Sequence, residues 1–418
     1  MLLEFYVENF RSIKRPTTLS LLADQALSEY RENLIRFRKE LVLPEVMILG
    51  PNGSGKTNIL RAISTAVQIL KQSASITPGE QIQQVIPFAF SSEQKEKPTT
   101  FEFNFTIDDL RYIYGYSITD KYVTEEFLYK YITESKSVIF ERDFQEFYYP
   151  KKMKQFKLYE TLITKNRLFL SLGAQLNDPE CSKVYEYLTT SFSTFNPRLL
   201  SAAGEKIILE NKLDGLKNRM LDLLQRADFS IDDFEIKTKD YKFEDLLRKN
   251  SFEVEDFSEE LLEQPYRTDN ESETTHTVFG DKYKLLLSEE SDGTQNYFYL
   301  LPIFLKALEE GTVLLLDELD DSLHPLLVAE LAALFNDPEM NPHHAQLIFT
   351  THDVLLLSMD NLRRDQIYFV EKTIDQQDTD LYSLADFSTK KGENRIRNYL
   401  VGRYGAIPRI LEGKLDDQ

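Results

Sequence analysis

The sequence predicts an α/β fold in which a mostly parallel sheet is flanked by helices. Short apolar segments at 45–49, 312–316 and 346–350 alternate with segments whose apolar residues recur at helical spacing. Strands that alternate with helices in this way favour a parallel sheet. A glycine-rich stretch at 50–57 connects the first of these strands to a helix. Alternating apolar and polar residues between 100 and 131 add an antiparallel β lobe.

The stretch 50–57 fits the pattern G-x-x-x-x-G-K-[ST] of phosphate-binding loops. Backbone N–H groups of such a loop surround phosphate oxygens, and the following helix adds its positive N-terminal end. Lys56 is predicted to reach the β- and γ-phosphates of ATP, and the Thr57 hydroxyl to bind Mg²⁺. The predicted nucleotide-binding residues are Gly50, Pro51, Asn52, Gly53, Ser54, Gly55, Lys56, Thr57 and Asn58.

Length and composition are those of a globular protein with two or three domains. The chain has 418 residues, is 42% hydrophobic and carries a net charge of -20. The charge argues against broad adhesion to nucleic acid, which needs Lys and Arg, although a local basic groove stays open. The single cysteine, Cys181, excludes an internal disulfide. With no apolar run of membrane-spanning length and no signal-peptide pattern, we expect a cytoplasmic protein without membrane contact.

The N-terminal half is predicted to be rich in strands. Residues 1–22 read as two strands, and 45–49 as the strand before the phosphate-binding loop. Further strands are expected at 87–90 and 100–107. The latter forms an antiparallel hairpin with 111–118, which a strand at 123–131 extends.

Residues 132–270 differ in texture, because they are charged, aromatic and helical in pattern. We interpret them as an inserted, mainly helical subdomain that recognises partners and ends in an acidic, solvated segment at 251–275. The insertion (132–270) then divides the domain that carries the phosphate-binding loop into an N-terminal half (1–131) and a C-terminal half (271–418).

The C-terminal half returns to alternating strands and helices. Strand character at 276–290 precedes a helix at 294–310, which Gly311 ends. After the strand at 312–316 come a helix at 325–335 and two further strands, at 346–350 and 366–370. Ligands of such sheets bind at the carboxyl ends of the strands, so polar residues there are candidates for chemistry.

Three such residues stand at strand ends. Asp317 and Glu318 directly follow the strand at 312–316, in the arrangement called Walker B. Asp317 is predicted to hold Mg²⁺, and Glu318 to act as general base towards the attacking water. His352 follows the next strand, where it is expected to lie near the γ-phosphate and to orient the water or sense the phosphate.

A small polar loop at 291–295, Ser-Asp-Gly-Thr-Gln, opens the helix before the Walker B strand, and such loops bind anions. At this point the order of motifs resembles the ABC-type ATPase head shared by RecF, SMC proteins and related repair ATPases. In that comparison 291–295 corresponds to the signature motif, 322–325 to the D-loop and His352 to the H-loop. The signature departs from the LSGGQ form, since Asp292 stands where a glycine is expected.

Four stretches resemble a family of prokaryotic AAA-type abortive-infection ATPases. They are the "SDGT" form of the signature, the opening Val-Glu-Asn-Phe-Arg-Ser-Ile at 7–13, the stretch 317–325 and the tail 402–408. Members are similar to the ATPase subunit of two-gene phage-defence systems such as PARIS. The resemblance implies ATP and Mg²⁺ as ligands and a head-to-tail homo-oligomer of at least two heads. In that assembly Ser291 and Gly293 contact the γ-phosphate bound by the other subunit.

The same resemblance implies a separate effector protein, with a nuclease as the leading candidate, and a phage-derived trigger. It also implies a Q-loop glutamine that links Mg²⁺ to the inserted lobe, for which Gln83 and Gln84 are the candidates.

Three other functions stay open. A RecF-like repair ATPase would bind DNA directly, which a basic stripe on the assembled dimer would support and the acidic balance disfavours. A metabolic P-loop kinase needs no catalytic glutamate, so the pair Glu318 and His352 argues against it. A scaffold that binds ATP without turnover is disfavoured by the intact Glu318.

Overall fold

The computed structural model describes residues 1–195, 200–210, 213, 215–242, 265–359, 362–373, 375–388 and 392–408. The chain divides into two compact units. The first consists of Met1–Asn196, Ala307–Asp321 and Val328–Gln418, and the second of Pro197–Lys306 and Ser322–Leu327. No helix in the described ranges is long and apolar enough to cross a lipid bilayer.

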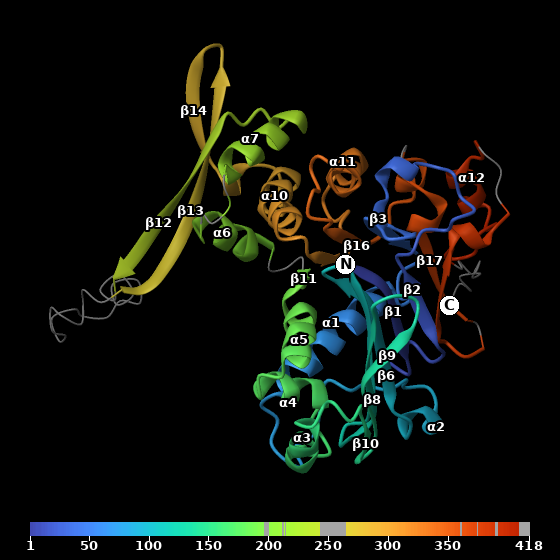
Figure 1. Ribbon diagram of the computed structural model, residues 1–418. Coiled ribbons are helices and arrows are strands. Elements are labelled where there is room, and N and C mark those ends of the chain that lie inside the picture. The colour runs from blue at the N-terminus through green and yellow to red at the C-terminus, as the bar shows by residue number, and fades with distance from the viewer. Residues whose placement is uncertain are drawn as a thin grey trace, which may run out of the picture. The chain divides into compact units, whose positions relative to one another are not determined.

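The first unit contains the predicted parallel sheet (Figure 1). Five of its six strands run parallel, and the last pairs antiparallel at one edge. One strand, 346–351, lies between the strand before the phosphate-binding loop and the Walker B strand. Because the three strands are parallel, their carboxyl ends lie at the same edge of the sheet. In spatial order the strands are β11 (Phe192–Phe195), β15 (Val313–Leu316), β16 (Gln346–Thr351), β5 (Glu45–Leu49), β17 (Ile367–Lys372) and β18 (Thr379–Ser383).

A seven-stranded antiparallel sheet completes this unit and confirms the predicted β lobe. Its strands, in spatial order, are β10 (Glu146–Tyr148), β9 (Lys136–Asp143), β8 (Val123–Tyr131), β7 (Leu110–Ile118), β6 (Thr99–Ile107), β1 (Leu2–Glu8) and β2 (Thr17–Ser20). A two-stranded sheet pairs β3 (Ile35–Phe37) with β4 (Glu40–Val42). The helices that begin or end in this unit are α1 (Lys56–Ser73), α2 (Ser92–Lys95), α3 (Phe156–Leu162), α4 (Phe169–Gln175), α5 (Pro179–Thr190), α11 (Pro325–Asn336) and α12 (Arg395–Leu400).

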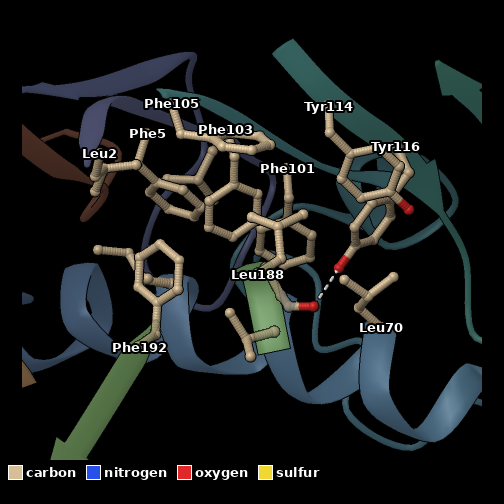
Figure 2. Close-up of a cluster of buried hydrophobic side chains, with 14 of the residues drawn as sticks. Leu2, Phe5, Leu70, Phe101, Phe103, Phe105, Tyr114, Tyr116, Leu188 and Phe192 are labelled. Atoms are coloured by element: carbon tan, nitrogen blue, oxygen red, sulfur yellow. Dashed lines mark hydrogen bonds between the residues drawn. The ribbon is translucent and has the colours of Figure 1, made fainter. Parts of the chain in front are cut away.

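The core of the first unit is an aromatic layer against helix α1 (Figure 2). Phe101, Phe103 and Phe105 occupy alternate positions of β6 and are buried, as the alternation predicts. Phe103 lies 5.6 Å from Phe192 of β11, measured between ring centroids, so the layer also contacts the edge of the parallel sheet. The Tyr116 hydroxyl donates a hydrogen bond of 2.8 Å to the Ala66 carbonyl of α1. This packing fixes the helix whose first turn carries the phosphate-binding residues.

The predicted insertion at 132–270 is wrong in its boundaries, and strands accompany the helices that the pattern predicted. Residues up to 196 belong to the first unit, in which β9 and β10 extend the antiparallel sheet and β11 joins the parallel one. The charged texture was misleading because Arg142 of β9 is fully buried, with Nη1 3.5 Å from the equally buried Glu126. The Glu126 carboxylate also accepts the N–H groups of Phe169 and Leu170, at the start of α4.

The second unit carries a three-stranded antiparallel sheet and helices. The predicted acidic segment falls partly outside the described residues, since 243–264 are not described, whereas 265–275 belong to a strand. The predicted strand character at 276–290 and the helix expected at 294–310 are confirmed. The elements are α6 (Leu200–Glu210), α7 (Leu216–Arg226), β12 (Asp233–Lys242), β13 (Pro265–Val278), β14 (Asp281–Leu286) and α10 (Asp292–Glu310), whose last turn falls in the first unit.

The strand predicted at 87–90 does not form. Pro87 has no N–H to give to a sheet ladder, and the Phe88 N–H donates to the Asn9 side-chain carbonyl at 3.0 Å. The Arg11 N–H donates to the Ile86 carbonyl at 2.8 Å. The backbone of this segment therefore holds the turn after β1 and pairs with no strand, and of residues 87–90 only Phe88 has a buried side chain.

Candidate functional site

The phosphate-binding loop leaves the end of β5, whose five residues are all buried. A Cβ atom at Gly50 would lie 2.2 Å from the Val370 carbonyl of β17, so only glycine lets the chain leave the sheet there. Gly53 and Gly55 adopt positive φ angles of 73° and 111°, which residues with side chains rarely adopt. Helix α1 starts at Lys56, directly after the loop. The strand, loop and helix thus provide the predicted setting for phosphate binding.

Lys56 points back into this loop from the first turn of α1. Its Nζ atom donates to the carbonyl of Gly50 at 2.7 Å and to that of Pro51 at 3.2 Å. Burial lowers the pKa of the Lys56 ammonium, and the carboxylates of Glu318, Asp317 and Asp320 oppose that decrease. The two carbonyl groups therefore hold the lysine beside the loop, and the nearby carboxylates of Glu318, Asp317 and Asp320 favour its charged form.

Asp317 stands at the end of β15 and faces the first turn of α1. The Thr57 hydroxyl donates to its Oδ1 atom at 3.2 Å. The described residues contain no group of three or more His, Cys, Asp and Glu side chains that could hold a metal. Protein sites for Mg²⁺ with phosphate use one or two protein oxygens and complete the shell with water and phosphate. The pair Thr57 and Asp317 fits such a Mg²⁺ ion.

Glu318, His352 and Lys56 form a chain of contacts. The Lys56 Nζ atom lies 3.2 Å from His352 Nδ1, and His352 Nε2 lies 3.2 Å from Glu318 Oε1. Because an ammonium group only donates hydrogen bonds, Nδ1 accepts and the imidazole proton sits on Nε2, which donates to Glu318. Asp320 holds the backbone of this histidine, with Oδ2 accepting the His352 N–H at 3.1 Å. No described residue donates a hydrogen bond to the second carboxylate oxygen of Glu318, which leaves that oxygen for an attacking water.

Two residues from distant segments close the loop from the side. The Thr379 hydroxyl, at the start of β18, lies 2.7 Å from Ser12 Oγ and donates to the Ser54 carbonyl at 3.1 Å. Asn58, predicted to bind the nucleotide, donates its side-chain amide to Ser12 Oγ at 2.7 Å. In the structure Asn58 thus ties the turn after β1 to helix α1. Ser12 lies in the stretch 7–13 that carries the family resemblance, but neither it nor Thr379 was predicted to contact the loop, because only folding brings them there.

The loop retains a polar atom that suits a phosphate. Ser54 is 2% exposed, and its buried hydroxyl has no hydrogen-bond partner among the described residues. A buried hydroxyl without a partner is costly unless a ligand satisfies it. Its place in the loop, beside Lys56 and the N-terminus of α1, fits a phosphate group. Asn52 is exposed at the tip of the loop.

Ser291 and Gly293, the predicted signature residues, belong to the second unit. The Ser291 hydroxyl accepts the Thr294 N–H at 3.2 Å and lies 2.8 Å from the Thr294 hydroxyl, at the start of α10. A Cβ atom at Gly293 would lie 3.0 Å from the Ser322 carbonyl, so the loop stays free of side-chain bulk at that point. Ser291 directly precedes the 19-residue helix α10 and Gly293 lies in its first turn, so these small polar residues stand at a helix N-terminus as predicted, although most of 291–295 is helical.

The proposed Q-loop glutamines are wrong for that role. Gln83 and Gln84 line a surface pocket of about 330 Å³ together with Gln72, and the Gln84 side chain donates to Gln72. Gln72 lies in the last turn of α1, whereas Thr57 lies in the first. The 15 positions from Thr57 to Gln72 span about 22 Å of helix, which is too far for these side chains to reach a metal at Thr57.

Substituting Gly55 by Ala is expected to damage the loop more than the same change at Gly53. A Cβ atom at Gly55 would lie 2.1 Å from Thr379 Oγ1 and 2.9 Å from Ser12 Oγ, whereas one at Gly53 would have no atom of the described residues within 4 Å apart from its neighbours in the chain. Gly53→Ala strains a φ of 73°, beside the left-handed region, by about 1 kcal/mol. Gly55→Ala is strained more, because a φ of 111° lies outside that region, and the overlap adds about 1–3 kcal/mol.

Thermal unfolding and nucleotide affinity, measured on both variants, check this expectation. Gly53→Ala serves as the matched control for the strain alone. Equal losses in the two variants would mean that Thr379 does not close the loop as the structure shows.

A family described as "AAA domain, putative AbiEii toxin, Type IV TA system" matches residues 46–358, which include the loop, Asp317, Glu318 and His352. No curated protein sequence matches the chain.

Solved structures similar to the chain include the SMC head domain from Thermotoga maritima, at 15% identity and a TM-score of 0.44, covering 91% of this chain and 98% of that one. An SMC head bound to the C-winged helix domain of ScpA is 13% identical, with a TM-score of 0.44 and coverages of 91% and 97%. An Smc head domain with an extended coiled coil, bound to the C-terminal domain of ScpA derived from Pyrococcus furiosus, is 13% identical. Its TM-score is 0.42 and the coverages are 91% and 96%.

Proposed function

The chain belongs to the AAA-domain family that matches residues 46–358, and we propose that it is a Mg²⁺-dependent ATPase that works as an ATP-controlled switch. The observation that carries this proposal is the chain of contacts from Lys56 through His352 to Glu318, beside the pair Thr57 and Asp317. A site that only binds nucleotide needs no carboxylate aligned by a histidine. These groups are suited to activating water.

The chemistry follows from the positions of the donors and acceptors. Glu318 accepts a proton from water, the water oxygen attacks the terminal phosphorus, and ADP leaves with the bridging oxygen. His352 keeps one carboxylate oxygen of Glu318 occupied, so that the other faces the water. Lys56 and the N-terminus of α1 stabilise the negative charge on the phosphate oxygens.

We assign Ser291 and Gly293 to the second half of a composite site. Their small polar loop at the start of α10 suits an anion, and the partner that supplies one is a second copy of this chain with ATP in its own phosphate-binding loop. ATP binding then joins two heads and hydrolysis releases them. The cycle makes the assembly a signal that depends on nucleotide.

The output of this switch is a separate effector protein in defence against phage. The family description, with its toxin and abortive-infection vocabulary, supports this role. A nuclease is the leading candidate for the effector, and a phage component for the trigger. The net charge of -20 favours a protein partner over broad contact with nucleic acid.

Capture of partners from the native host tests this function. Glu318→Gln, which is expected to stay loaded with ATP, should retain an effector that Lys56→Ala does not retain when both are used as bait. Mass spectrometry of the retained proteins identifies that effector. If both variants retain the same proteins in the same amounts, partner binding does not depend on nucleotide and the switch is refuted.

A further inference from the structure

Thr350 contacts both acids of the proposed site. It lies in β16, between β15 and β5, and is fully buried. Its hydroxyl donates to Asp317 Oδ1 at 2.6 Å and accepts the Glu318 N–H at 2.8 Å. Its carbonyl accepts the Leu319 N–H at 3.1 Å. One threonine therefore holds a carboxylate and two consecutive backbone N–H groups of the segment after β15.

The backbone of Glu318 makes these contacts significant. Its φ angle is +52°, in the left-handed region that residues with a side chain avoid. Such a conformation persists only where the surroundings impose it. Thr350 supplies that constraint by accepting hydrogen bonds from the N–H groups of Glu318 and Leu319. The resulting turn directs the Glu318 carboxylate to His352 Nε2.

The contact to Asp317 has a second consequence. Oδ1 accepts the hydroxyls of both Thr350 and Thr57, whereas Oδ2 accepts no hydrogen bond from the described residues. A carboxylate held through one oxygen keeps a fixed orientation. The other oxygen is then available to the shell of a cation.

We propose that Thr350 is a positioning residue for the reaction, which rests on the proposed ATPase function. Its single hydroxyl couples the orientation of the metal-binding Asp317 to the backbone of the general base Glu318. Because one group serves both acids, a change at this position alters the metal requirement and the rate together.

The variants Thr350→Val and Thr350→Ser distinguish the contribution of the Thr350 hydroxyl from that of its side-chain packing. Valine keeps the branched shape and the strand preference of threonine but removes the hydroxyl, whereas serine keeps the hydroxyl and removes a methyl group. Thr312→Val is the matched control, since Thr312 is 5% exposed and no described residue forms a hydrogen bond with its buried hydroxyl. It loses a hydroxyl of equal burial that holds no acid.

Two readouts on the full chain test the proposal. Steady-state ATP hydrolysis gives kcat and KM, and a fluorescent non-hydrolysable ATP analogue gives the Mg²⁺ concentration at half-maximal binding. Thr350→Val should lower kcat by roughly tenfold to a hundredfold, as expected for lost hydrogen bonds to a charged group. It should also raise the Mg²⁺ requirement severalfold, with KM for ATP nearly unchanged.

Thr350→Ser and Thr312→Val should stay within about threefold of the wild type in both readouts, which the loss of a weak contact allows. Equal losses in the valine and serine variants, with an unchanged Mg²⁺ requirement, would show that Thr350 only packs the strand and would overturn the proposal. So would a Thr350→Val protein that matches the wild type. A folded wild type that binds the analogue but releases no phosphate would refute the ATPase function instead, while the Mg²⁺ requirement still decides the role of Thr350 towards Asp317.

Discussion

Lys56→Ala is expected to weaken ATP binding by roughly a hundredfold or more, because charge-assisted contacts to phosphate are lost and no nearby group replaces them. In the structure the Lys56 ammonium lies against the carbonyls of Gly50 and Pro51, beside His352. Calorimetry or fluorescent-nucleotide titration measures the effect.

Lys71→Ala is the matched control, since Lys71 is an exposed lysine in the last turn of the same helix. It should bind ATP as the wild type does. Wild-type affinity in Lys56→Ala would contradict the assignment of residues 50–57 as the phosphate-binding loop.

Glu318→Gln is expected to lower ATP turnover by roughly two to four orders of magnitude while ATP binding is retained. The glutamine carbonyl can still accept the His352 Nε2–H, so the shape of the site persists, but an amide does not take a proton from water. Phosphate release under saturating ATP measures the loss. Glu339→Gln controls for the change of charge, because Glu339 is an exposed glutamate outside the proposed site.

The same variant should accumulate as a nucleotide-loaded assembly, which light scattering detects as a rise in mass with ATP. Adding Ser291→Arg should abolish that rise, because a bulky cation replaces a small hydroxyl at the junction. A mass that neither ATP nor Ser291→Arg changes would leave a single-headed enzyme or a nucleotide-independent oligomer.

Local patterns predicted much of this fold and site. The phosphate-binding loop, the acids after β15 and the histidine after β16 each follow a short apolar strand, so their place at one sheet edge follows from the sequence alone. The alternation at Phe101, Phe103 and Phe105 likewise predicted a strand with one buried face.

What the sequence did not predict depends on contacts between distant residues. Ser12 and Thr379 meet across 367 positions of the chain, and although Ser12 lies in the stretch 7–13, nothing in that stretch indicates a contact with Thr379. Thr350 looks like an ordinary strand residue, because threonine suits strands for its branched shape. Arg142 falls in the charged stretch interpreted as an insertion, but its side chain is buried against Glu126 in the first unit, which composition alone does not show.

Mixing two inactive variants tests most directly whether ATP is hydrolysed between two heads. Lys56→Ala lacks a working phosphate-binding loop but keeps its signature residues, whereas Ser291→Arg has the opposite defect. Each alone should release little phosphate, because every composite site carries one lesion. In an equimolar mixture, a mixed pair contains one intact site, built from the loop of one chain and the signature of the other, so activity should reappear well above the sum of the separate proteins. A mixture no more active than that sum, with both variants folded, would contradict the composite site.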